Sequence, residues 1–459
     1  MEMIERIAIV IVSFFAFAKL FKLSSGTLSV KRINVLNLTF YYILVFGMIG
    51  GSLIFLGFKD HYLVNKIGSA EVVDKGYTLI LLAAIELPVC VLIFNRLMGI
   101  RNYDTFYEEY VRKPVEVSIS NSSSVFHISL ILTVTGFLSL IYTFVMVGYV
   151  PLFELLKGNF DIMSQRINIS RNFRGNEYIR NILALGMIPV LSYLAYIYWR
   201  QTKEQKWKRL FFFLVVLSVM CKTHDFEKAP IFTYFFYFYV IETMMGRIKS
   251  IGRAVKIILI ALAGIVFVYY FFIGYRGDLI SLTNGPISRI FITQIATLFL
   301  HVQLFPSYHE YLSGKSFPAF LTKLLGFDGG IRSGRVVMEN YNRYAFENGT
   351  AGVMNSLYIA EAYANWGWAG AIAAPIVVGF FISVIPNFVL FQKKDPINMT
   401  IYIVLLTSYT NAIVGGFVDF VYNALVVILI FILLVCKSIV QNGRLHLVKS
   451  RRYKVESEK

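Results

Sequence analysis

Long apolar runs separated by short polar segments are the dominant pattern along this chain. Runs such as Val35–Phe58, Val125–Val150 and Ala369–Phe391 contain no Asp, Glu, Lys or Arg. A helix needs about 20 predominantly apolar residues to cross the hydrocarbon core of a bilayer. Since a backbone in lipid must also satisfy its hydrogen bonds internally, the pattern predicts an all-α, polytopic transmembrane helix bundle.

The apolar runs predict about eleven spans, which would place the two ends of the chain on opposite sides of the membrane. The predicted spans are Ile4–Leu20, Val35–Leu56, Tyr77–Phe94, Val125–Tyr149, Ile182–Trp199, Leu210–Cys221, Ile231–Met245, Ile257–Ile273, Trp366–Phe391, Ile397–Val414 and Phe420–Cys436.

Two of the segments between spans are long. They cover about 151–181 and 275–352, and loops of this length are usually functional or disordered. Both contain apolar stretches, so we expect ordered loops that form an outer cap. In the second loop, an amphipathic stretch that begins at Arg289 should lie flat on the membrane surface. We therefore expect one integral membrane domain over residues 1–459 with a basic tail at 437–459.

Composition and charge agree with this view and remove other classes of protein. The chain is 57% hydrophobic and 15% charged, whereas soluble proteins average about 25% charged residues. The net charge of +17 could indicate a nucleic-acid partner. However, more than half of the 44 basic residues fall in segments on one side if the N-terminus faces out. The positive-inside rule then explains the charge, places the C-terminal tail in the cytoplasm, and leaves no reason to expect nucleic acid.

The outer loops nevertheless hold many arginines. A guanidinium group binds phosphate oxygens through two parallel hydrogen bonds and stays charged when partly desolvated. The cluster thus favours an anionic substrate at the outer surface, although any single arginine could instead be solvated or paired with a nearby acid. The candidate phosphate-binding residues are Arg166, Arg171, Arg174, Arg276, Arg289, Arg332, Arg335 and Arg343.

The stretch 349–370 carries a polar stripe into the ninth predicted span. If it is helical, at about 100° per residue, four polar residues share one face: Asn355, Tyr358, Glu361 and Asn365. An ionisable residue inside a membrane is costly and is a functional candidate by default. Two interpretations of Glu361 stay open: a catalytic carboxylate, or a structural carboxylate paired with an arginine of the outer loops.

Other ionisable groups are weaker candidates. His301 could shuttle protons, but its position favours an interfacial packing role. The charged segment Lys222–Lys228 either lines a cavity or forms a self-compensated outer turn. Glu86 and Asp419 are isolated, which favours structural roles. The three cysteines fit no metal motif, and we predict neither a metal site nor a cofactor.

The segment Leu357–Gly370, together with the many spans and the arginine-bearing outer loops, resembles the oligosaccharide repeat-unit polymerases, the Wzy-type O-antigen polymerases. The resemblance implies a GT-C-like membrane fold in the bacterial inner membrane and a metal-independent, inverting glycosyltransferase. Such an enzyme transfers a growing glycan from undecaprenyl pyrophosphate onto a new lipid-linked unit, to build O-antigen, capsule or exopolysaccharide. Its expected partners are these lipid-linked oligosaccharides, membrane lipid, a chain-length regulator and a flippase.

This resemblance suggests roles for the candidate residues. The outer arginines, with Tyr358 and Asn355, would bind the pyrophosphate and glycan, and Glu361, or else His301, would orient or deprotonate the acceptor hydroxyl. An O-antigen ligase is the nearest alternative, because it uses the same leaving group with a different acceptor. A lipid-linked oligosaccharide flippase is a non-enzymatic alternative, but such transporters usually show repeated halves, and no repeat is visible here.

Overall fold

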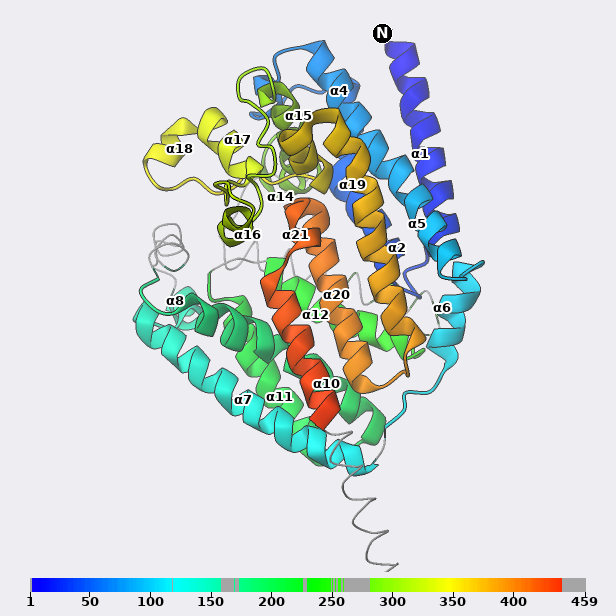
Figure 1. The fold of residues 1–459 in the computed structure, drawn as a ribbon, viewed down its shortest axis with the longest axis vertical. Coiled ribbons are helices and arrows are strands. Elements are labelled where there is room, and N and C mark those ends of the chain that lie inside the picture. Colours follow the sequence, from blue (N-terminus) through cyan, green and yellow to red (C-terminus); the bar gives the residue numbers. More distant parts are fainter. Residues whose placement is uncertain are drawn as a thin grey trace, which may run out of the picture.

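The computed structural model describes residues 2–117, 119–157, 169, 173–225, 229–248, 250, 252, 255–256, 259 and 281–439. Within these residues the regular secondary structure is entirely helical (Figure 1). Nine helices of the described part of the chain are long and apolar enough to cross a membrane. The predicted all-α membrane bundle is thereby confirmed, and the protein is a multi-pass membrane protein.

The helices follow one another with few interruptions. Four of the candidate spans in the described part of the chain contain π-helical turns, at Leu44–Met48, Leu82–Glu86, Ile179–Gly186 and Arg289–Thr293. The helices are α1 Met3–Ser25, α2 Val35–Ile43, α3 Ile49–Phe55, α4 Ala70–Leu81, α5 Leu87–Leu97, α6 Tyr103–Arg112, α7 Ile119–Val147, α8 Pro151–Lys157, α10 Met187–Thr202, α11 Gln205–Lys222, α12 Ala229–Met244, α14 Gly285–Ser288, α15 Gln294–Leu304, α16 Ala319–Leu324, α17 Ser333–Tyr341, α18 Arg343–Glu347, α19 Tyr358–Phe391, α20 Pro396–Gly415 and α21 Val418–Val421, followed by a helix over 424–439.

Eight of the nine candidate spans coincide with predicted spans. The sixth and seventh predicted spans are present as α11 and α12, although α12, with 16 residues, is short for a membrane crossing. The eighth, Ile257–Ile273, lies almost entirely outside the described residues. The count of eleven therefore stays a prediction, as does the GT-C-like fold.

The remaining candidate span, Gly285–Leu304, coincides with no predicted span. From the sequence, this segment was expected to lie flat on the membrane surface. Its second part, α15, packs against α3, α4 and α19 inside the bundle. Small residues make this insertion possible: a Cβ atom on Gly50 would lie 1.6 Å from the carbonyl oxygen of Phe291, and one on Gly76 would lie 2.3 Å from the ring of Phe299. Glycines let helix backbones approach closely in membranes, and their effect depends on which helix lies opposite.

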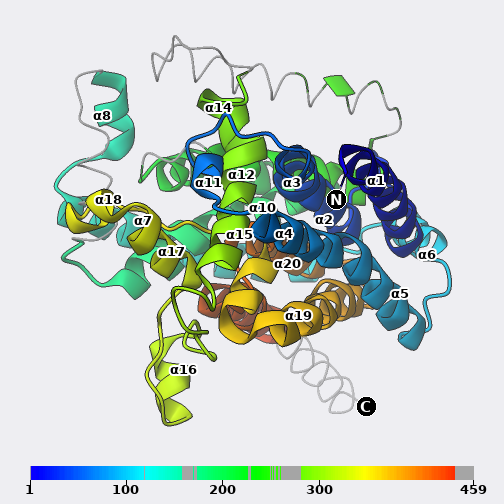
Figure 2. The same ribbon diagram turned by 90° about the horizontal axis from the view of Figure 1, so that it is seen from above.

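Helix α20 lies in the middle of the bundle, where it contacts α2, α10, α12 and α19 (Figure 2). Its start is set by Asp395, whose side chain accepts a hydrogen bond from the backbone N–H of Asn398, and by Pro396 in the first turn. Nearly all of its residues are buried. The cap helices α17 and α18 lie toward the same end of the molecule as the N-terminus, whereas the helix over 424–439, drawn in red, runs toward the opposite end (Figure 1).

Candidate functional site

Arg332 joins two carboxylates that are far apart in sequence. Its Nε lies 2.9 Å from Oε1 of Glu361, and its Nη1 and Nη2 lie 2.7 Å and 3.1 Å from the two carboxylate oxygens of Asp419. Arg332 directly precedes α17, Glu361 is in the first turn of α19, and Asp419 is in α21. One guanidinium group thus holds together the cap, the start of a span and the loop after α20.

The two carboxylates of this Arg332 triad differ in exposure. Glu361 is 4% exposed, and its second oxygen accepts a hydrogen bond from the backbone N–H of Val418 at 3.0 Å. The side chain of Asp419 is 34% exposed. Glu361 is therefore paired with an arginine of the long loop 275–352, as one of the two interpretations expected. Its predicted catalytic role stays a prediction. The exposed member of the pair is Asp419.

The electrostatics of the triad are set by burial and by opposite charge. Burial alone would lower the pKa of Arg332, but the hydrogen bond to Asp419 and the charges of Glu361 and Asp419 outweigh this effect, so that its pKa is raised. With both carboxylates ionised, the triad carries one net negative charge. If one of the two carboxylates accepted a proton, the net charge of the triad would become zero.

The loop after α20 supplies backbone to the same place. The carbonyl oxygen of Gly415 accepts a hydrogen bond from Nη2 of Arg332 at 3.3 Å. Gly416 has φ 149° and ψ 164°, a region that is essentially restricted to glycine. A Cβ atom there would lie 2.3 Å from Oε2 of Glu361 and 2.6 Å from Nη2 of Arg332. The site therefore requires glycine at 416 for both conformation and space.

Helix α15 holds the start of α17 in position. His301 is 1% exposed, its Nδ1 lies 2.7 Å from the carbonyl oxygen of Thr297, and its Nε2 lies 3.1 Å from Oγ of Ser333. Since a carbonyl only accepts, Nδ1 carries the proton in the neutral ring, and Ser333 donates to Nε2. His301 thus fixes the residue that follows Arg332, which is a positioning role. The catalytic role expected from the sequence stays a prediction.

Helix α19 is broken a few residues after Glu361, and the loop between α15 and α16 fills the break. Trp366 and Gly367 have non-helical backbone angles, with φ 60° and ψ −143° at Gly367. The carbonyl oxygens of Ala364 and Asn365 accept hydrogen bonds from the backbone N–H groups of Leu312 and Ser313, each at 2.9 Å. Broken helices at membrane depth are tolerated where protein satisfies the freed backbone groups. The break separates a short polar first segment from the long apolar remainder of the span.

Replacing Gly367 with Ala should destabilise this end of α19. The new Cβ atom would lie 2.8 Å from the ring of Tyr311, and the backbone conformation is unfavourable for any residue with a side chain. We expect a loss of about 2–4 kcal/mol in the free energy of unfolding, measured as a lower thermal unfolding midpoint of the purified protein in detergent. Gly99→Ala is a matched control, because Gly99 also has a positive φ but no atom lies within 4 Å of the position that its Cβ would take. Equal midpoints for the two variants would contradict this account of the break.

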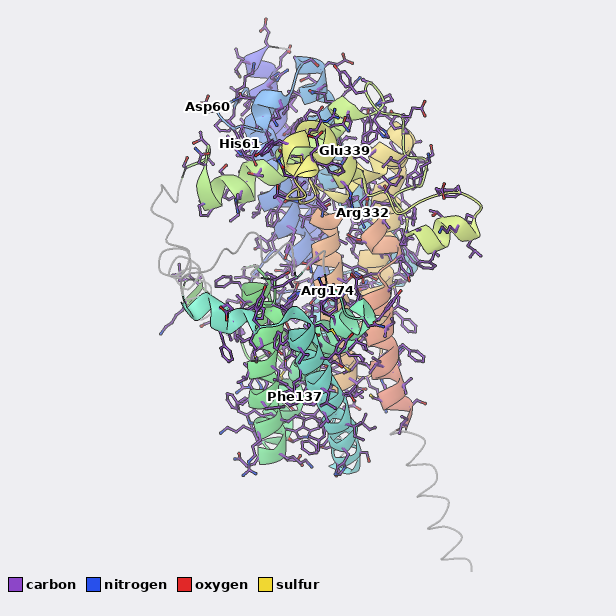
Figure 3. The ribbon with its side chains drawn as sticks, turned by 90° about the vertical axis from the view of Figure 1, so that its left-hand side faces the viewer. Asp60, His61, Phe137, Arg174, Arg332 and Glu339 are labelled. Atoms are coloured by element: carbon purple, nitrogen blue, oxygen red, sulfur yellow. The ribbon has the colours of Figure 1, made fainter. Side chains whose placement is uncertain are left out.

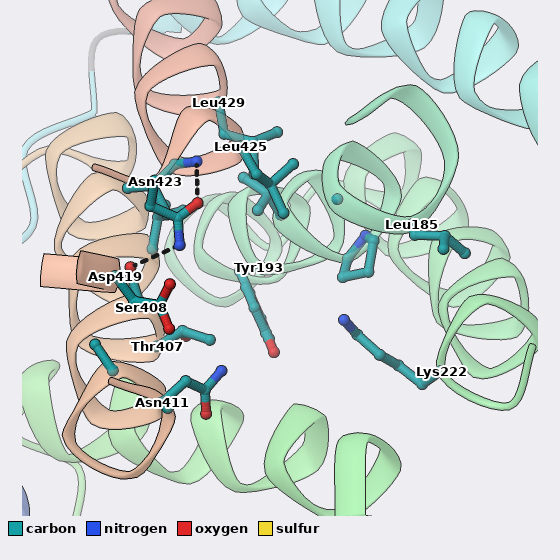
Figure 4. Close-up of a pocket in the computed structure, with 17 residues that line it drawn as sticks. Leu185, Tyr193, Lys222, Thr407, Ser408, Asn411, Asp419, Asn423, Leu425 and Leu429 are labelled. Carbon is teal, nitrogen blue, oxygen red and sulfur yellow. Dashed lines mark hydrogen bonds between the residues drawn. The ribbon is translucent and has the colours of Figure 1, made fainter. Parts of the chain in front are cut away.

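A cavity of about 340 Å³ begins at Asp419 of the Arg332 triad and extends between α10, α20 and the helix 424–439 (Figure 4). This volume is in the range of small-molecule sites in proteins. Its walls combine aliphatic side chains with hydroxyl, amide and charged groups. The polar side chains that line it are Tyr193, Lys222, Thr407, Ser408, Asn411, Asp419 and Asn423.

Lys222 and Asp419 lie on opposite walls of this cavity, and the ammonium group of Lys222 is directed into it (Figure 4). Lys222 is the last residue of α11. In the following turn, His224 and Asp225 lie together, with 3.7 Å between Nδ1 and Oδ1. Burial lowers the pKa of His224 and outweighs the opposing effect of Asp225. Of the two interpretations of the charged segment, the structure supports a cavity wall for Lys222.

The other predicted site residues are spread over the cap. Arg174 and Arg289 are exposed, and Figure 3 shows Arg332 at a height between Arg174 and Glu339 of α17. Arg335 lies over the ring of Phe346, and Arg343 pairs with Glu347 at 2.8 Å. Arg166, Arg171 and Arg276 lie outside the described residues.

Tyr358 and Asn355 do not line the cavity. Tyr358 is fully buried against Phe420, with 5.9 Å between the ring centroids. Asn355 precedes the first turn of α19, so it does not share a helical face with Glu361, and its carbonyl oxygen accepts hydrogen bonds from Gln294 and Thr297. Their predicted contact with substrate stays a prediction.

The uncharged polar residues of the cavity were not predicted from the sequence, and Asp419 was predicted to have a structural role. One signal was available: Thr407, Ser408 and Asn411 recur at helical spacing within the predicted span Ile397–Val414. A polar stripe of this kind in an otherwise apolar span indicates a face that does not meet lipid. Lys222 belongs to the charged segment Lys222–Lys228, for which a cavity wall was one of the two predicted interpretations.

Part of the chain is similar to a known protein family. Residues 338–442 match the family model of the O-antigen polysaccharide polymerase Wzy. The matched segment contains Glu361 and Asp419, whereas Arg332 and Lys222 lie outside it. The resemblance inferred from the sequence is confirmed over this part of the chain. No curated protein and no solved structure matches the chain.

Proposed function

We propose that the protein is a glycosyltransferase that polymerises oligosaccharide repeat units linked to undecaprenyl pyrophosphate, at the outer face of the bacterial inner membrane. The observation that carries the proposal is the cavity with a carboxylate, Asp419, on one wall and an ammonium group, Lys222, on the other. The match of residues 338–442 to the Wzy family supports the class of reaction. The product would be an O-antigen, capsule or exopolysaccharide.

The chemistry requires a base on one side of the anomeric carbon and a cation on the other. The hydroxyl oxygen of the acceptor sugar attacks the anomeric carbon of the donor glycan and forms the new C–O bond. The bond from this carbon to the pyrophosphate oxygen breaks, and its electron pair leaves with undecaprenyl pyrophosphate. The hydroxyl proton passes to a carboxylate. In-line attack therefore suits two groups that face each other across one cavity.

Asp419 is the better placed of the two carboxylates for accepting the proton. Both carboxylates are engaged by Arg332, but Asp419 lines the cavity and its side chain is 34% exposed, whereas Glu361 is 4% exposed and does not line the cavity. Arg332 then orients Asp419, and Glu361 orients Arg332. In this proposal Glu361 is a positioning residue, which refines the role that the sequence suggested for it.

Lys222, with the arginines of the outer loops, would stabilise the pyrophosphate leaving group. An ammonium group in a partly dehydrated cavity interacts strongly with charge that develops in the transition state. Side-chain cations thus neutralise the leaving group without a metal ion. Arg174 and Arg289, both exposed at the described parts of the loops, would bind phosphate oxygens bidentately.

Replacing Lys222 with Met should therefore reduce polymer synthesis by about 100-fold, because Met keeps the length of the side chain and removes its charge. The measurement is the rate of polymer formation by purified protein from lipid-linked repeat units. Lys323→Met is a matched control on the exposed face of the cap. A Lys222→Met protein that polymerises at the rate of this control would remove Lys222 from the mechanism.

The function itself is tested by a gel of surface glycan from a strain that lacks the gene, with and without the gene restored. Single repeat units in the deletion and a ladder after restoration would support a polymerase. Polymer that accumulates on the carrier lipid without reaching the surface would indicate a ligase. Repeat units retained at the inner face of the membrane would indicate a flippase.

A further inference from the structure

A second polar groove lies on the cap, away from the cavity of the Arg332 triad. It has a volume of about 540 Å³. It is lined by one face of α17 and α18 and, from the preceding loop, by His309. The lining residues are His309, Ile331, Val336, Glu339, Asn340, Arg343, Phe346 and Glu347.

The spacing of these residues makes the groove a continuous strip. Val336, Glu339 and Asn340 share one side of α17, and Arg343, Phe346 and Glu347 share one side of α18, because the members of each set lie three or four positions from the first. The chain departs from helical geometry at Asn342, with φ −141° and ψ 58°, but α18 resumes at the next residue. The polar strip thus runs along both helices and remains open to solvent.

The chemistry of the strip suits a carbohydrate better than a lipid or a phosphate. Two carboxylates, an amide and an imidazole present planar groups that pair with neighbouring sugar hydroxyls, which both donate and accept. Phe346 adds an apolar ring to the lining of the groove. The guanidinium group of Arg335 lies over one face of this ring, so the C–H face of a sugar would lie on its other face. The only guanidinium group lining the groove in the described residues, that of Arg343, is already paired with Glu347 at 2.8 Å. Because the lining holds two carboxylates, Glu339 and Glu347, and its one guanidinium group is already paired, the groove would repel an anionic ligand.

The groove is also placed where a glycan attached at the reaction centre would reach. Ile331 lines the groove and the next residue, Arg332, holds Asp419. From Arg332 to Glu339 the helix rises by about 10 Å at ~1.5 Å per residue, which is the reach of a short oligosaccharide. Figure 3 shows Glu339 above Arg332 on the cap. Helix α17 therefore connects the carboxylate site with the groove.

From this arrangement we propose that the α17–α18 groove is a binding site for the neutral part of the oligosaccharide, several sugar units from the reacting bond. This inference rests on the proposed function, because it assigns the groove to the glycan of that reaction. The groove retains the growing chain between successive additions. Its occupancy determines how many repeat units are added before the chain is released.

The test uses the full-length protein in detergent, with Glu339→Gln and Glu347→Gln combined in one variant and Phe346→Ala in another. Gln keeps the size of Glu and removes the charged acceptor, so folding should be retained. Matched controls are Asp328→Asn and Tyr344→Ala, which are exposed on the cap outside the groove. The first readout is binding of the repeat-unit oligosaccharide, released from its carrier lipid, by saturation-transfer NMR. The second readout is the length distribution of the polymer.

We expect both groove variants to bind the oligosaccharide about tenfold more weakly and to make shorter chains, while the first addition proceeds at the normal rate. Wild-type protein that does not bind the oligosaccharide, or groove variants that match the controls in both readouts, would overturn the inference. These outcomes differ from failure of the proposed function. If deletion of the gene leaves the polymer ladder unchanged, the polymerase proposal fails even if the groove variants lose oligosaccharide binding.

Discussion

Replacing Asp419 with Asn should lower the rate of polymer formation by about two to four orders of magnitude, the range attributed to a general base. Asn keeps the shape of the side chain and still offers one oxygen to Arg332, so the triad can form. It cannot accept the proton of the acceptor hydroxyl. The measurement is single-turnover addition of one repeat unit by purified protein, followed as a function of pH.

Glu361→Gln is the informative partner of this variant. Its oxygen can still accept the hydrogen bond from Val418, but the charge that orients Arg332 is lost. We expect a smaller loss of rate than for Asp419→Asn, with the shape of the pH profile retained. The reverse order, in which Glu361→Gln abolishes addition and Asp419→Asn retains it, would return the base to Glu361, as the sequence suggested.

Gly416→Ala should have the second large effect, on stability and on activity together. The substitution forces an alanine into φ 149° and ψ 164° and places its Cβ atom 2.3 Å from Oε2 of Glu361. The strain and the overlap should cost about 3–5 kcal/mol. The loop after α20 would shift and separate Asp419 from Arg332. Thermal unfolding in detergent and polymer formation measure the two effects.

Gly57→Ala separates conformational strain from the loss of the site. Gly57 has φ 100°, and nothing lies within 4 Å of the Cβ position that would be added. This variant should lose some stability and keep its activity. If Gly416→Ala behaved in the same way, the close approach of Gly416 to Glu361 would have no part in function.

Much of the membrane architecture could be read from the sequence, because the cost of placing polar groups in lipid acts on each segment separately. The spans from Val35 to Leu56 and from Ile397 to Val414 contain no Asp, Glu, Lys or Arg, and both are helices of the bundle. The segment Leu357–Gly370 likewise carried the family resemblance in its own residues, and it lies within the matched region. Such signals need no knowledge of what lies opposite.

The position of Gly285–Leu304 could not be read in this way. Its amphipathic pattern suits a helix on a membrane surface as well as one in a protein interior. The choice was made by the glycines of other helices, such as Gly50 and Gly76, which leave space for its backbone and side chains. Complementarity between two segments is a property of the pair and is invisible in either one.

The candidate site shows the same division. The sequence by itself determined that Glu361 enters a membrane helix and that the two long loops are rich in arginine, and it raised pairing of Glu361 with one of these arginines as one alternative. Only the tertiary structure decided that Arg332 is the partner, that Asp419 shares it, and that Lys222 faces Asp419 across a cavity. The physical reason is that a guanidinium group selects its carboxylates by distance in space. Arg332 and Asp419, 87 residues apart, become neighbours only when the cap has closed over the bundle.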